Sequence, residues 1–425
     1  MSTPHGLAPA AGPIRTSVRP PGSKSVTIRA LAVAALAPGR SHLYGPLDAD
    51  DTLAMAEVLR GFGVAVAVGS EPWTVDGRGA DLRTPDQVLD AGESGLTARI
   101  AIAMAALVDG EVAIDGVGRL RMRPMGPLLD ALANQGVSFS ASEGTLPVTV
   151  SGQGGLWGGE IAVDSTLSSQ FVTALLLVAP TTREPTRLRI EGDRGAAGYV
   201  ELTGRVMSGF GAQVDQTITG YEVPNTGYHP ADFQVEPDVS AAVYPMVAAA
   251  ITGGSTEIEG VWLDSLQPDI AVADRLGAMG CSVTEGETGL VIEGPEILEP
   301  IETDMAGAPD GALALAVACL FASAPSRITG LSTLRHKESD RLLAMSQEME
   351  KLGARVTIED DALRIEPGKL RGAIIDPHGD HRVAMSLALV GLRVGGVVIE
   401  HPEVVNKTWP GFWETMSSAT SSRLD

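Results

Sequence analysis

The sequence has few of the features that mark secreted or membrane proteins. It contains two cysteines, Cys281 and Cys319, whose spacing shows no pairing, and this usage fits the reducing cytosol. The longest uncharged apolar stretch, residues 311–326, is short for a membrane span. The first twenty residues are rich in Pro, Ala and Gly and lack the apolar block of a signal peptide. These absences predict a cytoplasmic protein.

Positive charge is also scarce. The chain has 31 Lys and Arg against 53 Asp and Glu, a formal net charge of −22, which disfavours nucleic acid and anionic membranes as partners. A small anionic substrate would need a local basic patch. The sequence lacks HExxH, CxxC, GxSxG and the GxxxxGK[ST] phosphate loop, and its seven histidines are scattered. We therefore expect no metal.

A repeat is the most informative feature that is present. With 425 residues the chain is too long for one ordinary core, which favours two domains. A short amphipathic helix, a glycine and an apolar strand follow one another five times. A glycine at this place fits a left-handed residue that ends a helix before a strand. These marker glycines, 69 to 75 residues apart, are Gly63, Gly136, Gly211, Gly280 and Gly353.

A second helix recurs with the same period. It is apolar nearly all round, so we expect it to be buried inside its domain. Six copies of this unit, three to a domain, predict two similar α/β domains. The copies begin, at steps of 70 to 74 residues, near Ser23, Ser94, Ser168, Ser240, Asp310 and Asp380.

The starts of these apolar helices carry more polar residues than capping requires. A helix N-terminus offers free N–H groups and partial positive charge, so it attracts anions. A cation there is unfavourable unless an anion lies nearby. Ser, Asp and Gly at any single start are explained by capping alone. For Lys24, Arg29 and Arg382 taken together we favour a function, namely the binding of several anionic groups at one place.

Two further segments are cationic. Residues 121–125 precede an amphipathic helix and, taken alone, fit a solvated turn equally well. Residues 335–341 place Lys337 and Arg341 four apart, on one face of an expected helix, which also fits an exposed salt-bridged helix start. Lys407 is a surface lysine by default.

Two long segments resemble the signatures of the EPSP synthases, which are enolpyruvyl transferases. These segments are PGSKSVTIRALAVAALA and RHKESDRLLAM, and shorter ones from DADDTLAM to NKTWPGFW lie in the same order. The match runs from about residue 15 to 415, so the chain is identified as a member of this family.

The resemblance implies an α/β (α+β) fold with two similar domains. Each domain has three βαβαββ-like units with buried parallel helices, in an inside-out α/β barrel-like arrangement. Residues 22–235 are inserted into a domain made of residues 1–21 and 236–425. The family places the active site in a cleft between the domains, which closes when the substrates arrive.

The resemblance also implies a reaction. The enolpyruvyl group of phosphoenolpyruvate is transferred to the 5-hydroxyl of shikimate-3-phosphate with release of phosphate, in the shikimate pathway to chorismate and aromatic amino acids. It needs no cofactor, and we expect a monomer. Asp310 is the candidate base for the hydroxyl, and Glu338 is the candidate for proton transfer at the methylene carbon. The catalytic set is Asp310, Glu338, Lys24, Lys337 and His381.

The resemblance also implies which residues bind the two substrates. Those implied for shikimate-3-phosphate are Lys24, Ser25, Arg29, Ser168, Ser169, Gln170, Tyr199, Asp310 and Lys337. Those implied for phosphoenolpyruvate are Lys24, Gly95, Arg123, Gln170, Arg341, Arg382 and Lys407.

Four positions depart from the family pattern. Ile28 stands where Asn is common, and Leu96 stands where Thr or Ser is common. Ala196 replaces a common Ser, and Thr333 stands where some members have Asn. These departures leave open a paralogue that acts on a related cyclitol phosphate, or one that eliminates phosphate from shikimate-3-phosphate without phosphoenolpyruvate. A UDP-sugar enzyme is disfavoured because the inserted domain lacks the reactive cysteine of that sibling. A binding scaffold is disfavoured because it would not need both Asp310 and Glu338.

Overall fold

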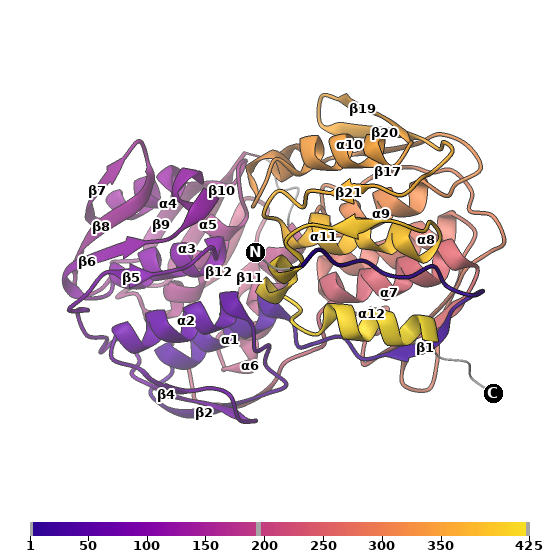
Figure 1. Cartoon of the computed structure of the whole chain (residues 1–425). Coiled ribbons are helices and arrows are strands. Elements are labelled where there is room, and N and C mark those ends of the chain that lie inside the picture. Colours follow the sequence, from indigo (N-terminus) through magenta and orange to yellow (C-terminus); the bar gives the residue numbers. More distant parts are fainter. Residues whose placement is uncertain (1–2, 193–196, 422–425) are drawn as a thin grey trace. The chain divides into compact units, whose positions relative to one another are not determined.

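The computed structural model describes residues 3–192 and 197–421. The chain forms two compact units. The inserted unit is Gly22–Val235, and the discontinuous unit combines Met1–Pro21 with Glu236–Asp425 (Figure 1). In the discontinuous unit the Asp238 N–H donates to the Pro21 carbonyl at 2.8 Å, so the two chain segments that flank the insertion are joined directly.

The inserted unit repeats a βαβαββ arrangement. Its sheets have the orders β13-β2-β4-β3, β5-β6-β8-β7 and β9-β10-β12-β11, and in each the first two strands are parallel. The strands are β2 (Gly39–Tyr44), β3 (Ala65–Ala67), β4 (Trp73–Gly77), β5 (Leu89–Asp90), β6 (Asp109–Asp115), β7 (Ser138–Ser142), β8 (Thr145–Gln153), β9 (Gly159–Asp164), β10 (Thr186–Glu191), β11 (Asp215–Gln216), β12 (Gly220–Val223) and β13 (Asp232–Gln234). The helices are α1 (Lys24–Leu36), α2 (Asp50–Gly61), α3 (Gly95–Ala105), α4 (Gly126–Ala133), α5 (Gln170–Val178) and α6 (Ala197–Gly209).

The discontinuous unit follows the same plan. Its sheets have the orders β1-β14-β16-β15, β17-β18-β20-β19 and β21-β22. The strands are β1 (Arg15–Val18), β14 (Ser255–Glu259), β15 (Ser282–Glu285), β16 (Gly289–Glu293), β17 (Glu302–Asp304), β18 (Ser326–Thr329), β19 (Arg355–Glu359), β20 (Ala362–Glu366), β21 (Ile374–Ile375) and β22 (Val398–Ile399). The helices are α7 (Val239–Thr252), α8 (Ala271–Ala278), α9 (Ala312–Cys319), α10 (Arg341–Lys351), α11 (His381–Ala388) and α12 (Phe412–Ser421).

The last repeat differs from the others. Within the described ranges its sheet has only β21 and β22. The N-terminal segment lies beside it, because the backbone of His5 exchanges hydrogen bonds of 3.0 and 2.7 Å with Ile399. The sequence predicted six equivalent copies, and this one is instead completed by the beginning of the chain.

The apolar helices form the two cores. α1, α3 and α5 are buried and pack on one another in the inserted unit, while in the discontinuous unit α9 packs on both α7 and α11. Alanine-rich surfaces let such helices approach closely. The predicted buried helices, and with them the α/β fold class, are confirmed. Cys319 of α9 is part of this core, and burial raises the pKa of its thiol to about 12.

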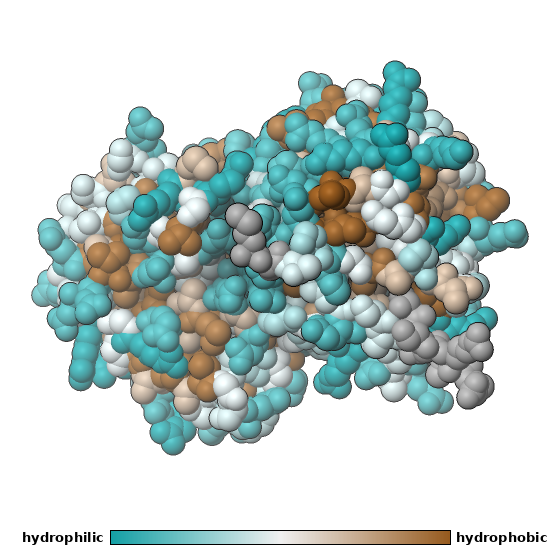
Figure 2. Space-filling view, viewed as in Figure 1, coloured by the Kyte–Doolittle hydropathy of each residue, from teal (hydrophilic) through white to brown (hydrophobic). Residues whose placement is uncertain are grey.

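The marker glycines end their helices as predicted. Each has a positive φ, between 80° and 98°, which is costly for residues with a Cβ. On the face shown in Figure 2, hydrophobic side chains are scattered among hydrophilic ones. Among the described helices, none combines the length and apolar character needed to cross a membrane.

Candidate functional site

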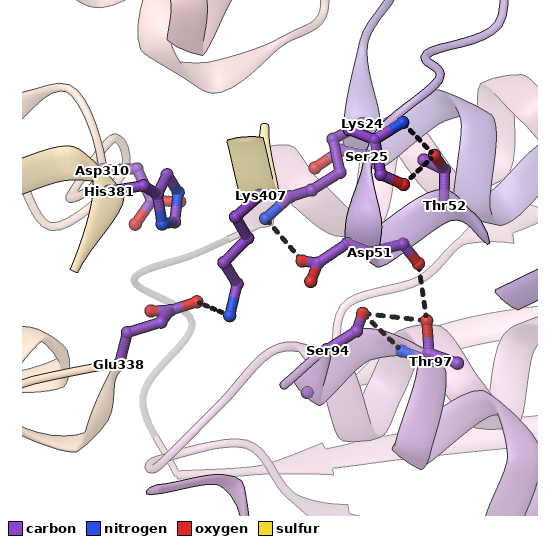
Figure 3. A network of polar contacts seen from close by, with 12 residues as sticks. Lys24, Ser25, Asp51, Thr52, Ser94, Thr97, Asp310, Glu338, His381 and Lys407 are labelled. Atoms are coloured by element: carbon purple, nitrogen blue, oxygen red, sulfur yellow. Dashed lines mark hydrogen bonds and ion pairs between the residues drawn. The ribbon is translucent and has the colours of Figure 1, made fainter. Parts of the chain in front are cut away.

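In the inserted unit, the start of α1 presents a lysine held by a buried carboxylate. Ser23 caps the helix by accepting from the Val26 N–H. Lys24 is the first helical residue, and its Nζ lies 3.1 Å from Oδ2 of Asp51 at the start of α2 (Figure 3). The pair fixes an ammonium group at the positive end of a helix, where the carboxylate of Asp51 supplies negative charge beside it.

Arg29 lies one turn further along α1 and is 1% exposed. Its guanidinium donates to the Thr203 hydroxyl at 2.8 Å and to the carbonyls of Ser25 and Tyr199 at 2.9 and 3.3 Å. Burial lowers the pKa of Arg29 to about 10. Ser25, Arg29 and Tyr199, which the sequence predicted as one group, are therefore brought together, and neutral oxygen atoms leave the charge available to an anion.

A second cation lies against the start of α3. A Cβ added at Gly95 would be 2.6–2.8 Å from the guanidinium atoms of Arg123, so only glycine lets this group approach the helix so closely. The side chain of Arg123 is buried. Its neighbour Arg121, from the same cationic segment, is instead exposed and paired with Asp115. The segment is thus split between a surface ion pair and a buried cation at a helix N-terminus.

The start of α5 is organised by Arg99 of α3. Arg99 Nη1 donates to the side-chain oxygen of Gln170 at 2.6 Å, and Nη2 donates to the Pro124 carbonyl at 2.9 Å. Ser168 accepts from the Gln170 N–H at 3.2 Å. Ser168, Ser169 and Gln170 are half-buried at this helix start. Arg99 therefore orients a predicted ligand-binding residue.

In the discontinuous unit, Arg341 gathers several carboxylates. It is the first residue of α10 and its side chain is 1% exposed. Its guanidinium lies 2.8 Å from Asp310, 3.0 Å from Glu338 and 2.8 Å from Asp380. Burial by itself would lower the pKa of Arg341, but these carboxylates outweigh it and raise that pKa.

Asp310 lies at the centre of the cations. Arg382 Nη2 is 3.3 Å and Lys337 Nζ 3.6 Å from its carboxylate, in addition to Arg341. Although burial raises the pKa of Asp310, the cations hold it well below its usual range. Because α9 begins two residues later with Gly311 as its N-cap, the carboxylate faces cations instead of capping the helix. The carboxylate is therefore ionised at neutral pH.

Glu338 and Lys407 form the other side of this cluster. Lys407 Nζ lies 3.8 Å from Glu338 Oε1 (Figure 3). Lys407 ends the short helix η6 (Pro402–Lys407) and is 5% exposed, so its default interpretation as a surface lysine was wrong. His381 is buried, with Nδ1 3.8 Å from Asp380 Oδ1.

One local prediction is corrected. Lys337 and Arg341 do not share a helical face, because the short helix η4 (Ser332–His336) ends before Lys337, which is extended with φ −92° and ψ −154°. Helix α10 begins only at Arg341, after the N-cap Asp340. Both cations still reach Asp310, but from a loop and a helix start.

Sequence reasoning gave no site role to four residues that shape this geometry. Asp380 caps α11 through the Arg382 N–H at 2.9 Å and accepts from the Ser339 hydroxyl. Its place at a helix start was noticed, but only as a cap. The others are Asp51, Arg99 and Asp269, of which the first two lie in segments that matched the family. Within the described ranges, no group of three or more His, Cys, Asp or Glu side chains is arranged to hold a metal ion.

The departures from the family pattern have different settings. Ile28 and Leu96 are buried in the core of the inserted unit. Thr333 lies in η4 and is half-buried. Ala196 lies outside the described residues. The first two positions therefore contribute to packing.

Comparisons with known proteins agree with this architecture. The family model described as EPSP synthase (3-phosphoshikimate 1-carboxyvinyltransferase) matches residues 9–416. A 3-phosphoshikimate 1-carboxyvinyltransferase of Methanospirillum hungatei is 38% identical over 95% of this chain and 96% of that protein. The 3-phosphoshikimate 1-carboxyvinyltransferase of Pseudomonas savastanoi pv. phaseolicola is 40% identical over 97% of this chain and 96% of that protein. The solved EPSP synthase of Acinetobacter baumannii has a TM-score of 0.82 and 28% identity over 97% of both chains.

The family model and these relatives span nearly the whole chain, including both units and the segments that carry the clusters around Lys24 and Arg341. The chain therefore belongs to the EPSP synthase family, the 3-phosphoshikimate 1-carboxyvinyltransferases.

Proposed function

We propose that this chain transfers the enolpyruvyl group of phosphoenolpyruvate to the 5-hydroxyl of shikimate-3-phosphate. The observation that carries the proposal is that two carboxylates, Asp310 and Glu338, are held by one buried guanidinium, that of Arg341. The reaction needs one proton removed from oxygen and another delivered to carbon. Two separate carboxylates, each beside cations, can serve these two tasks.

The acceptor is assigned mainly to the inserted unit. Arg29, surrounded by neutral oxygen atoms, offers its charge to the phosphate of shikimate-3-phosphate. The hydroxyls of Ser168 and Ser169 and the side chain of Tyr199 lie near helix starts that supply further donors. Lys24, held by Asp51, serves both substrates.

The donor carries a carboxylate and a phosphate, and several cations match them. Arg123 lies against the N-terminus of α3, with Gly95 beneath its guanidinium. Arg341, Arg382 and Lys407 supply charge in the discontinuous unit. Arg341, Arg382 and Lys407 each already pair with a carboxylate, and the two anionic groups of the donor would add further charge-assisted hydrogen bonds to these cations.

The chemical steps follow from these positions. Asp310, ionised at neutral pH, takes the proton of the 5-hydroxyl while that oxygen bonds to C2 of phosphoenolpyruvate. Glu338 gives a proton to C3, which yields a tetrahedral intermediate. Glu338 then removes a proton from C3 as the C–O bond to phosphate breaks, and the enolpyruvyl ether remains. Lys24 and Lys337 stabilise the developing charges, and His381, buried beside Asp380, completes the acid–base set.

The proposal is tested by the mass of the product. Incubation with both substrates should give a product that has gained an enolpyruvyl group, with one phosphate released for each turnover. Omission of either substrate should abolish phosphate release. Phosphate released from shikimate-3-phosphate alone would instead identify an eliminating paralogue, and turnover only with another cyclitol phosphate would identify a different acceptor.

Gly95→Ala should weaken the binding of phosphoenolpyruvate. The new Cβ collides with the guanidinium of Arg123, which must move away from the start of α3. A hydrogen bond to a charged group is worth about 1.5–3 kcal/mol, so KM for phosphoenolpyruvate should rise roughly 10- to 100-fold. KM for shikimate-3-phosphate should change little. Gly126→Ala, where a Cβ meets nothing within 4 Å, is the matched control; equal KM values in both variants would contradict the assignment of Arg123.

We further propose that the protein acts as a cytoplasmic monomer on these two small anionic substrates and not on nucleic acid. The two unpaired cysteines support the cytoplasmic location, and the net charge of −22 disfavours nucleic acid as a partner. Light scattering during size-exclusion chromatography should give one protomer mass, and a dimer mass at micromolar concentration would contradict it.

A further inference from the structure

A buried carboxylate that the mechanism above does not use lies beside Asp310. Asp269 belongs to the short helix η3 (Pro268–Ile270), and its side chain is 1% exposed. It accepts a hydrogen bond of 2.9 Å from the N–H of Gly311, the residue that follows Asp310. It also accepts a short hydrogen bond from the hydroxyl of Ser240 in α7. Asp269 thus ties the backbone next to the candidate base to a neighbouring buried helix.

The two aspartates also interact electrostatically. Burial, followed by the negative charge of Asp310, raises the pKa of Asp269 to about 6, while Arg382 and the donors from Ser240 and Gly311 oppose the rise. The positive charge of Arg382 acts on both aspartates. Its guanidinium pairs with Asp310 at 3.3 Å and donates to the Ser240 carbonyl at 3.5 Å. Two further cations lie beside Asp310. They are Lys337 and Arg341, which come from the η4–α10 segment.

Asp310 is a weak base in this setting, because cations stabilise its ionised form. A general base works best when its proton affinity suits the working pH. A second negative charge nearby offsets part of the cationic field and strengthens the base. The hydrogen bond to Gly311 simultaneously fixes the backbone on which the Asp310 side chain is carried.

We propose that Asp269 is a positioning residue of the reaction, which orients Asp310 through the Gly311 N–H and, by its charge, keeps Asp310 able to accept the hydroxyl proton. The inference rests on the role proposed above for Asp310. It assigns a function to a residue that would otherwise be a costly buried charge.

The test is Asp269→Asn, with Asp274→Asn as control. Asn keeps an oxygen for the Gly311 N–H, and its amide can donate to the Ser240 hydroxyl, so only the charge is lost. Asp274 lies on α8, is exposed and loses the same charge. We expect kcat of Asp269→Asn to fall roughly tenfold, with both KM values nearly unchanged. The control should keep wild-type kcat.

Two pH-dependent readouts separate this role from a merely structural one. Wild-type kcat should fall as the pH drops through about 6, where Asp269 becomes protonated, and the variant should lack this step. Because the folded pKa of Asp269 lies above its unfolded value of about 3.9, its contribution to stability is present below pH 4 and is lost as the pH rises through 6. Asp269→Asn should therefore melt at the same or a higher temperature than wild type at pH 8.

The outcomes are distinct. Wild-type kcat in Asp269→Asn, or a lower melting temperature with both KM values raised, would overturn the inference. If the wild type itself released no phosphate with both substrates, the proposed function would fail first. Asp269→Ala, which also removes the acceptors for Gly311 and Ser240, should lower both kcat and the melting temperature; a kcat equal to that of the wild type would likewise count against the inference.

Discussion

Asp310→Asn is expected to lower kcat by roughly 10²–10⁴-fold, the usual share of a general base. Asn keeps the size of the side chain but cannot take the hydroxyl proton. Steady-state phosphate release with both substrates saturating measures the effect. Asp264→Asn, at an exposed position of the same unit, is the control. A folded Asp310→Asn variant with near-normal kcat would remove Asp310 from the catalytic set.

The same variant has a pH signature in its stability. The pKa of Asp310 is held below its unfolded value, so its ion pairs stabilise the fold above about pH 4 and lose this effect as the pH falls through the folded pKa. The difference in melting temperature between wild type and Asp310→Asn should therefore be largest near neutral pH and shrink below pH 4. This readout does not depend on turnover, so it tests the electrostatic setting of Asp310 separately from its role.

Arg341→Met is expected to have the largest effect on stability. The substitution leaves the carboxylates of Asp310, Glu338 and Asp380 without their shared guanidinium, and removing one partner of a buried charge pair costs about 3–5 kcal/mol. Thermal unfolding at pH 7 should show a clearly lower melting temperature. Arg364→Met removes an exposed pair with Glu366, worth about 0–1 kcal/mol, and is the control. If Arg341→Met melted at the same temperature as wild type, Lys337 and Arg382 would suffice to balance the carboxylates.

The repeat could be predicted from sequence because its signals are local. Each apolar helix carries its own composition, and each marker glycine sits at a position whose backbone requires it. The last repeat escaped this reasoning because its completing segment, around His5, lies at the other end of the chain. No residue pattern near β22 indicates that the N-terminal segment pairs with this strand.

The candidate site was predictable only in part. Cations at helix starts were visible because they conflict with the helix dipole, as at Lys24 and Arg382. The buried carboxylates of Asp51 and Asp269 were not, because each resembles an ordinary acidic residue in the first turn of a helix. Likewise, local spacing could not show that Lys407 is buried or that Lys337 precedes the helix. Burial depends on how the repeats pack, which no single segment encodes.

The position of β1 has a consequence for synthesis on the ribosome. β1 pairs in parallel with β14, whose residues follow some 240 positions later, whereas residues 22–235 contain all the described strands of their own sheets. As the chain emerges from the ribosome, the inserted unit can complete the hydrogen bonds of its sheets before β14, the partner strand of β1, has been synthesised. Because the Pro21 carbonyl and the Asp238 N–H are bonded, the folded insert must deliver its two ends side by side. We expect a fragment of residues 22–235 to fold alone, and residues 1–21 to stay sensitive to proteases until the last repeat has been made.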